Sequence, residues 1–202
     1  MLKIAVFVSG RGSNLRAILD SQKLQDLIRV TAVISNKIDC PAFEIAKEYS
    51  INTYKVGKGE GAIQYSELSV FLTSLDIDLI VLAGFLKMIP ANVIDTFRNR
   101  IINIHPALLP AFGGKGMYGM HVHQAVFDSS AQVSGASVHF VDEIYDNGKI
   151  IAQRSIDISD VESAAEIASR VLEIEHELLP FVIEKFAQNK IILLNNRVKI
   201  LT

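Results

Sequence analysis

Apolar and polar residues alternate along this chain with two different periods. Short, nearly continuous apolar runs are typical of strands that are buried on both faces of a parallel sheet. Between these runs, apolar residues recur every three or four positions, as on one face of a helix. The pattern predicts strands at 2–8, 30–34, 53–56, 78–83 and 101–105, and helices that include 15–19, 41–49, 65–75 and 90–97. This alternation predicts an α/β fold with a doubly wound, mostly parallel sheet and right-handed crossovers.

The C-terminal part of the chain has a different order of elements. Two alternating runs, 136–141 and 149–158, flank the turn signal Asn147-Gly148, which predicts a hairpin and therefore an antiparallel strand in the sheet. Two further short runs, at 191–194 and 198–201, predict a terminal hairpin. No linker or repeat interrupts the sequence, so we expect a single domain over residues 1–202.

A long helix is predicted between these two hairpins. Ser159-x-x-Glu162 resembles a capping box and would open the helix. Apolar residues at helical spacing follow, and we expect them to face inward: Ile167, Val171, Ile174 and Leu178. Pro180 should kink or divide the helix, because proline lacks the N–H that the helix interior requires.

The strand at 101–105 carries the first candidate chemistry. Side chains two positions apart on a strand point to the same face, so Asn103 and His105 should project together. Pro106 favours an extended conformation for the histidine before it, which places His105 at the strand end. An amide that donates to a developing oxyanion and an imidazole that moves a proton suit acyl transfer. The alternative is a histidine that only packs in the core.

A glycine-rich loop follows the first strand. Residues 9–14 read Ser-Gly-Arg-Gly-Ser-Asn, and a helix follows. Ser13 and Asn14 are residue types that cap helices, and the backbone N–H groups there would suit a phosphate. The loop matches neither the dinucleotide fingerprint nor the ATP-binding loop. The alternative is a tight connection that happens to contain glycines.

Other candidate residues follow later strands. In an open α/β sheet, ligands bind beyond the carboxyl ends of the strands. Leu86, Met88 and Ile89 follow the strand at 78–83 and could line a slot for a flat ring, or could simply pack in the core. In the loop at 142–148, a carboxylate could hold His105 as an imidazolium. The chemistry alone does not choose among three acids there: Asp142, Glu143 and Asp146.

Composition excludes several classes of function. The net charge is −2 and no basic block occurs, so we expect no nucleic-acid partner. The longest apolar run, 79–86, is too short to cross a membrane. One cysteine, Cys40, leaves no disulfide framework. His121 and His123 have no nearby set of carboxylates, so we expect no metal. These features predict a soluble cytoplasmic protein.

Together these motifs resemble the phosphoribosylglycinamide formyltransferase family. The matching segments occur in the order expected for that family and cover residues 1 to about 190: VFVSGRGSNLRAI, VLAGFLKMI, INIHPALLPAF, SVHFVDEIYDNGKII and RVLEIEHELLP. The resemblance implies a one-carbon group transferase of purine biosynthesis. Its fold would have a phosphate-binding, Rossmann-like half at 1–100 and a catalytic, folate-binding half at 101–202.

The resemblance implies a role for each matched residue. The formyl group of 10-formyltetrahydrofolate would pass to the amine of glycinamide ribonucleotide, without a metal. Asn103, protonated His105 and Asp146 would be catalytic, and Asp146 would raise the pKa of His105 and position a water for proton relay. The remaining roles would be divided between the ribonucleotide (Gly12, Ser13, Asn14 and Glu175) and the folate (Leu86, Lys87, Met88, Ile89, Asp142 and Asp146).

The chain departs from the family pattern at three places. Ala62 stands where relatives often carry a basic residue for the folate tail, Lys87 replaces a frequent arginine, and the segment 113–119 looks longer. A related methionyl-tRNA formyltransferase would need a basic C-terminal domain, and a formyltetrahydrofolate hydrolase an additional N-terminal domain. A non-catalytic phosphate-binding module would not need the trio. We expect a monomer or a homodimer.

Overall fold

The computed structural model describes residues 1–201 and has an α/β fold. The strands are β1 (Leu2–Val8), β2 (Ile28–Ser35), β3 (Asn52–Lys55), β4 (Leu79–Leu82), β5 (Ile101–His105), β6 (Val133–Phe140), β7 (Ile150–Asp157), β8 (Ile191–Leu194) and β9 (Arg197–Ile200). The helices are α1 (Ser13–Asp20), α2 (Ala42–Glu48), α3 (Leu68–Ser74), α4 (Ala91–Thr96), α5 (Met120–Asp128) and α6 (Ala164–Ala187). A seven-stranded sheet has the order β3-β2-β1-β4-β5-β6-β7. The predicted mostly parallel sheet with an antiparallel C-terminal part is confirmed.

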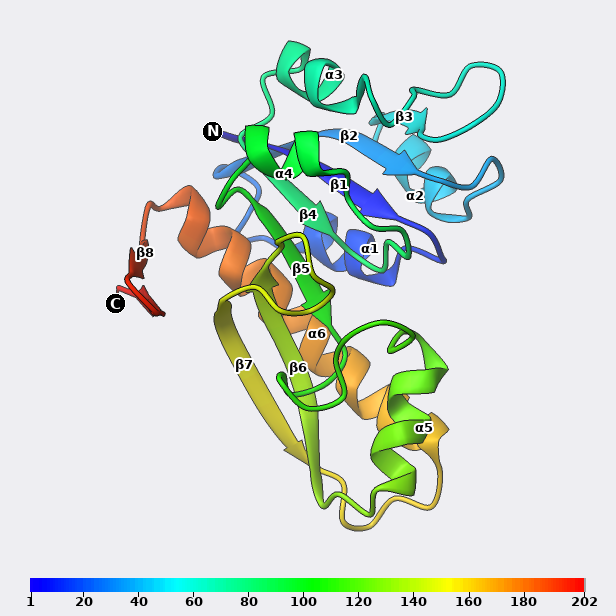
Figure 1. Ribbon diagram of the computed structural model, residues 1–202, viewed down its shortest axis with the longest axis vertical. Helices are drawn as coiled ribbons and strands as arrows, with labels where there is room; N and C mark the ends of the chain where they lie inside the picture. The colour runs from blue at the N-terminus through cyan, green and yellow to red at the C-terminus, as the bar shows by residue number, and fades with distance from the viewer. Residues whose placement is uncertain (202) are drawn as a thin grey trace. The chain divides into compact units, whose positions relative to one another are not determined.

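The chain forms two compact units, residues 1–102 and 103–202. In the first unit, β1 pairs in parallel with β2 and β4, and β2 pairs in parallel with β3 (Figure 1). The side chains from Ile4 to Val8 are all fully buried, as the continuous apolar run predicts. The third helix begins at Leu68, three residues later than predicted.

The glycine-rich loop after β1 depends on close packing against α2. Gly12 has a left-handed backbone, with φ of 81°, and it is the N-cap of α1. A Cβ atom at this position would lie 2.6 Å from the Cβ of Ala42, so only glycine fits. Ser13 and Asn14 lie inside the first turn, so the prediction that they cap the helix is wrong. The N-cap, Gly12, has no side chain that could accept from the amide groups of the first turn.

In the second unit, β6 and β7 pair antiparallel, and α6 packs against both strands (Figure 1). Two glycines allow the backbones to approach closely. A Cβ at Gly135 on β6 would lie 2.0 Å from the carbonyl oxygen of Arg154 on β7. A Cβ at Gly148, just before β7, would lie 1.8 Å from the carbonyl oxygen of Phe140. The hairpin of β8 and β9 agrees with its prediction.

Helix α6 begins later than predicted and is not divided. Its N-cap is Ser163, whose Oγ accepts a hydrogen bond from the backbone N–H of Glu166, so the capping box is Ser163-x-x-Glu166. Ser159 instead bonds to Asp157. Pro180 lies inside a helix of 24 residues that continues to Ala187. The inward face also differs, because Glu175 is buried whereas Ile174 is only partly buried.

Candidate active site

Strand β5 presents the predicted amide and imidazole. The His105 side chain is 3% exposed, and its Nε2 lies 2.9 Å from the carbonyl oxygen of Phe112. A carbonyl oxygen can only accept, so Nε2 carries the hydrogen in the neutral ring. The other ring nitrogen, Nδ1, lies 3.6 Å from Oδ2 of Asp146. The neutral ring therefore presents an unprotonated nitrogen to a carboxylate.

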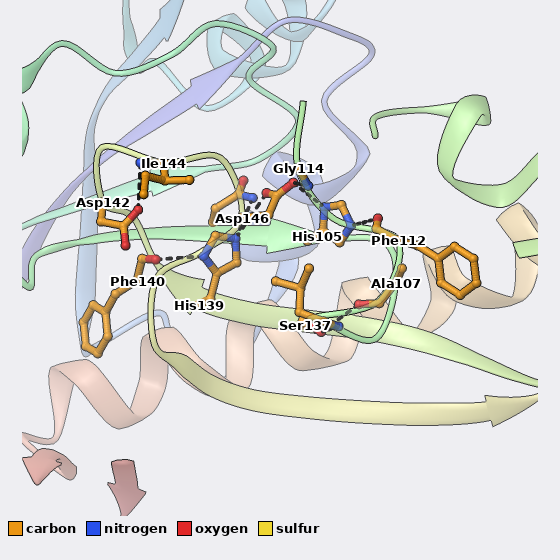
Figure 2. Close-up of polar contacts among 12 residues, drawn as sticks. His105, Ala107, Phe112, Gly114, Ser137, His139, Phe140, Asp142, Ile144 and Asp146 are labelled. Carbon is orange, nitrogen blue, oxygen red and sulfur yellow. Dashed lines mark hydrogen bonds and ion pairs between the residues drawn. The ribbon is translucent and has the colours of Figure 1, made fainter. Parts of the chain in front are cut away.

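Asp146 lies between two imidazole rings (Figure 2). Its Oδ2 faces Nδ1 of His105, and its Oδ1 lies 3.6 Å from Nε2 of His139. Oδ2 also accepts a hydrogen bond of 2.9 Å from the backbone N–H of Gly114. The residue has a left-handed backbone with φ of 54°, which is unusual outside glycine and concentrates at functional sites. The carboxylate is thus held by the loop on one side and faces histidines on the other.

The other two acids of this loop do not reach His105. Asp142 accepts hydrogen bonds from the backbone N–H of Ile144 at 2.9 Å and from the amide of Asn147 at 3.2 Å. It therefore shapes the loop that carries Asp146. Glu143 is exposed. The geometry agrees with the choice of Asp146 as the partner of His105.

His139 is a site residue that sequence reasoning missed. The residue is 2% exposed. Its Nδ1 lies 2.7 Å from the carbonyl oxygen of Phe140, and its Nε2 lies 3.1 Å from Nδ2 of Asn103. The signal that could have revealed it is the same period of two that selected Asn103 and His105. Ser137 and His139 are polar residues two apart on β6, where their side chains point to the same face.

Burial reverses the expected charge of His105. Burial is the largest influence and lowers the pKa of His105 below its ordinary value of 6.5, although Asp146 and the Phe112 carbonyl raise it. The predicted effect of Asp146, which raises the pKa of His105, is confirmed, but burial outweighs it. The protonated ring that was expected is therefore not the form that burial favours near pH 7. Burial also raises the pKa of Asp146, but His139, His105 and the Gly114 N–H outweigh it, so this pKa falls below 3.8.

The segment 112–114 acts directly on this pair. The Phe112 carbonyl accepts from His105 and the Gly114 N–H donates to Asp146. Between them, a Cβ at Gly113 would lie 3.2 Å from Cβ of Asp146 and 2.5 Å from Cδ2 of Leu109. The segment 113–119 therefore begins beside the His105–Asp146 pair.

In the first unit, two candidate loops meet at the carboxyl ends of adjacent strands. The N–H of Ser9 donates to the carbonyl of Gly84 at 3.0 Å, and the Oγ of Ser9 accepts from the N–H of Leu86 at 3.1 Å. The loop with Gly12, Ser13 and Asn14 and the segment 86–89 thus lie at one edge of this unit. Leu86 and Met88 are 45% and 49% exposed and available to a ligand, and Lys87 is also exposed. The Ile89 side chain is buried in the core. Of the two roles considered for it, packing in the core and lining a slot for a ring, it has the first.

Glu175 is buried on α6 of the second unit, and its contact with substrate stays a prediction. Among residues 1–201, no group of three or more histidine, cysteine or acidic side chains could hold a metal. No helix within that range combines the length and the apolar character needed to cross a membrane.

Comparisons with known proteins identify the family of this chain. The formyl transferase family matches residues 2–183. A phosphoribosylglycinamide formyltransferase of Haemophilus influenzae is 33% identical over 97% of this chain and 92% of its own. A chloroplastic protein of the same name from Vigna unguiculata is 43% identical over 94% of this chain. The chain spans 62% to 66% of the length of the three chloroplastic relatives that it matches.

The fold of a solved relative is also very similar. The crystal structure of phosphoribosylglycinamide formyltransferase from Anaplasma phagocytophilum is 31% identical and superposes with a TM-score of 0.89. The match covers 100% of this chain and 95% of that one. The resemblance inferred from the motifs is thereby confirmed, and the chain belongs to the formyl transferase family.

Proposed function

We propose that this protein is a phosphoribosylglycinamide formyltransferase, which transfers the formyl group of 10-formyltetrahydrofolate to the amine of glycinamide ribonucleotide in purine biosynthesis. The observation that carries the proposal is the buried imidazole of His105 facing the Asp146 carboxylate, with Asn103 on the same strand. A module that only binds phosphate needs no such group. The family and the names of its relatives support the substrates.

The first unit supplies binding groups in this proposal. The first turn of α1, with Gly12, Ser13 and Asn14, would bind the phosphate of the ribonucleotide through backbone N–H groups and the helix dipole. The exposed side chains of Leu86 and Met88 suit the flat, apolar ring of a folate. Lys87 and Ile89 would contribute backbone groups beside them. Two residues of the second unit would add to these groups. Glu175 would contact the ribose or the glycinamide end, and Asp142 would support the folate through its loop.

The second unit supplies the chemistry. The amine of the substrate attacks the formyl carbon, and the formyl oxygen gains negative charge. The amide of Asn103 donates a hydrogen bond to that oxygen, and one preorganised donor of this kind is typically worth about 3–4 kcal/mol. The amine's proton passes to the His105–Asp146 pair, where the carboxylate stabilises the imidazolium. His105 then also stabilises the oxyanion and returns the proton to N10 of the folate as the carbon–nitrogen bond breaks.

The test measures release of deformylated folate by absorbance, with and without glycinamide ribonucleotide. We expect turnover that requires the ribonucleotide and that falls by roughly 10²-fold or more in His105→Ala. Turnover without the ribonucleotide would instead identify a hydrolase. Binding of the ribonucleotide without any turnover would identify a binding module.

Two further parts of the proposal concern the surroundings of the protein. We expect action on small molecules alone, by a monomer or a homodimer, in the cytoplasm. Gel filtration with light scattering measures the oligomeric state, and fractionation of the source cells measures the compartment. Because some relatives are named as chloroplastic, the compartment stays a prediction.

A further inference from the structure

His139 has a hydrogen-bond partner that selects the tautomer of its neutral ring, and the inference drawn from it rests on the proposed function. Nδ1 lies 2.7 Å from the carbonyl oxygen of Phe140, so it carries the hydrogen. In the neutral ring, Nε2 is then only an acceptor. The side chain is 2% exposed, so few water molecules compete for either nitrogen.

The acceptor nitrogen sets the direction of the Asn103 carboxamide. Nε2 lies 3.1 Å from Nδ2 of Asn103, which has two hydrogens and donates one of them here. The second hydrogen remains for the formyl oxygen. If the carboxamide rotated by half a turn, it would place its own oxygen against Nε2, and two acceptors would then face each other. His139 therefore disfavours the orientation in which Asn103 would repel an oxyanion.

His139 also faces the carboxylate of the site. Its Nε2 lies 3.6 Å from Oδ1 of Asp146, which is too long for a hydrogen bond. In the neutral ring, the lone pair of Nε2 can accept a hydrogen bond from Asn103 but not from the Asp146 carboxylate, which has no hydrogen to donate. Asn103 is therefore its donor. We propose that His139 is a positioning residue, which orients the Asn103 amide so that one N–H points to the oxyanion and does not itself touch the reacting atoms.

Two substitutions of His139 test this role. His139→Leu removes the acceptor, and we expect kcat to fall about 10- to 100-fold while KM for both substrates changes less than about threefold. His139→Gln keeps an oxygen that can accept from Asn103, so we expect kcat within about fivefold of the wild type. Ser134→Ala is the control, because this hydroxyl is buried on the same strand without a hydrogen-bond partner within residues 1–201.

A double-mutant cycle with Asn103→Ala separates positioning from general structural support. If His139 acts through Asn103, then His139→Leu should have almost no further effect on kcat once Asn103 is alanine. The inference would be overturned if the kcat losses of the two single variants multiplied in the double variant. It would also be overturned if His139→Leu kept the kcat of the wild type. If His139→Leu does not fold, the cycle with Asn103→Ala is measured with His139→Asn instead. The shorter side chain of asparagine moves the acceptor away from Asn103, and His139→Gln serves as the variant that keeps it. A wild type without ribonucleotide-dependent turnover refutes the proposed function, whereas multiplying losses in an active enzyme refute only the role of His139.

Discussion

The carboxylate of Asp146 lies between the rings of His105 and His139, and its negative charge raises the pKa of His105. Asp146→Asn keeps the shape but removes the charge that raises the pKa of His105. We therefore expect the pKa of His105 to fall further and kcat to fall by roughly 10²-fold. An NMR titration of the His105 ring measures the first effect, and steady-state kinetics measures the second. Glu143→Gln is the control, and an unchanged His105 pKa in Asp146→Asn would contradict the argument.

Gly113 tests how closely the loop must approach Asp146. In Gly113→Ala, the new methyl group would lie 2.5 Å from Cδ2 of Leu109 and 3.2 Å from Cβ of Asp146, so both side chains would have to shift. Because small displacements of reacting groups are costly, we expect kcat to fall about 5- to 10-fold. Gly116→Ala is the matched control. It has a φ of 93° and strains the backbone, but its Cβ meets nothing within 4 Å, so it should reduce stability and leave kcat nearly unchanged. Equal kcat losses in both variants would argue against a role for the contact between position 113 and Asp146.

At the residue scale, the sequence predicted part of the site. The period of a strand was enough to pair Asn103 with His105. Asp146 could not be separated from Asp142 and Glu143 until the family pattern was considered, because all three are acids in one loop. The neutral state of His105 could not be predicted, since alternation gives the direction of a side chain and not the extent of its burial.

At the scale of elements, a hydroxyl on β6 holds the loop that follows β5. The Oγ of Ser137 donates to the carbonyl of Ala107 at 2.7 Å and accepts from the N–H of Leu109 at 3.0 Å. The amide of Gln153 on β7 donates both to this Oγ and to the carbonyl of Leu109. The loop is thus fastened to two strands directly after His105.

Removing this hydroxyl should loosen the loop. Ser137→Ala leaves buried partners on the loop and on Gln153 without their hydrogen bonds, and we expect the free energy of unfolding to fall by about 1–3 kcal/mol. Urea denaturation measures the change. Ser134→Ala removes a hydroxyl from the same strand but breaks no hydrogen bond within the described chain, so it should cost much less. Similar losses in the two variants would show that burial of the hydroxyl, and not its hydrogen bonds, matters.

The sequence predicted the strands and the long helix α6 but not all their boundaries. The start of α6 shows why, since Ser159-x-x-Glu162 and Ser163-x-x-Glu166 have the same spacing of residue types. Only the course of the chain, with Ser159 bonded to Asp157, decides which one caps the helix. Pro180 was expected to kink or divide the helix, but the helix runs through it, because packing against β6 and β7 outweighs the loss of one hydrogen bond.

At the scale of the whole molecule, buried histidines make stability depend on pH. Burial lowers the pKa of His105, His123 and His176 below 6.5. The unfolded chain therefore binds more protons than the folded one as pH falls through 6.5, and stability must decrease. We expect Tm to be lower at pH 5.5 than at pH 7.5, by about 2–4 °C for each kcal/mol lost.

Calorimetry in buffers of equal ionic strength measures this difference. Asp146 does not contribute in this range, because its pKa lies below 3.8. His123→Gln removes one of the three groups, so its Tm should vary less between the two pH values than that of the wild type. A Tm that rises on acidification would contradict the assignment of buried, neutral rings.

Gly135 and Gly148 have a consequence for experiments that infer function from tolerance to mutation. Each is pressed against the backbone of the other strand of the β6–β7 hairpin, so that no side chain, however small, fits. A library randomised at these codons and selected for purine prototrophy should return only glycine, just as one at 105 should return only histidine. The selection alone would then assign all three positions to catalysis. Immunoblots of the soluble fraction would separate them, because the glycine variants would be missing and the His105 variants present but inactive.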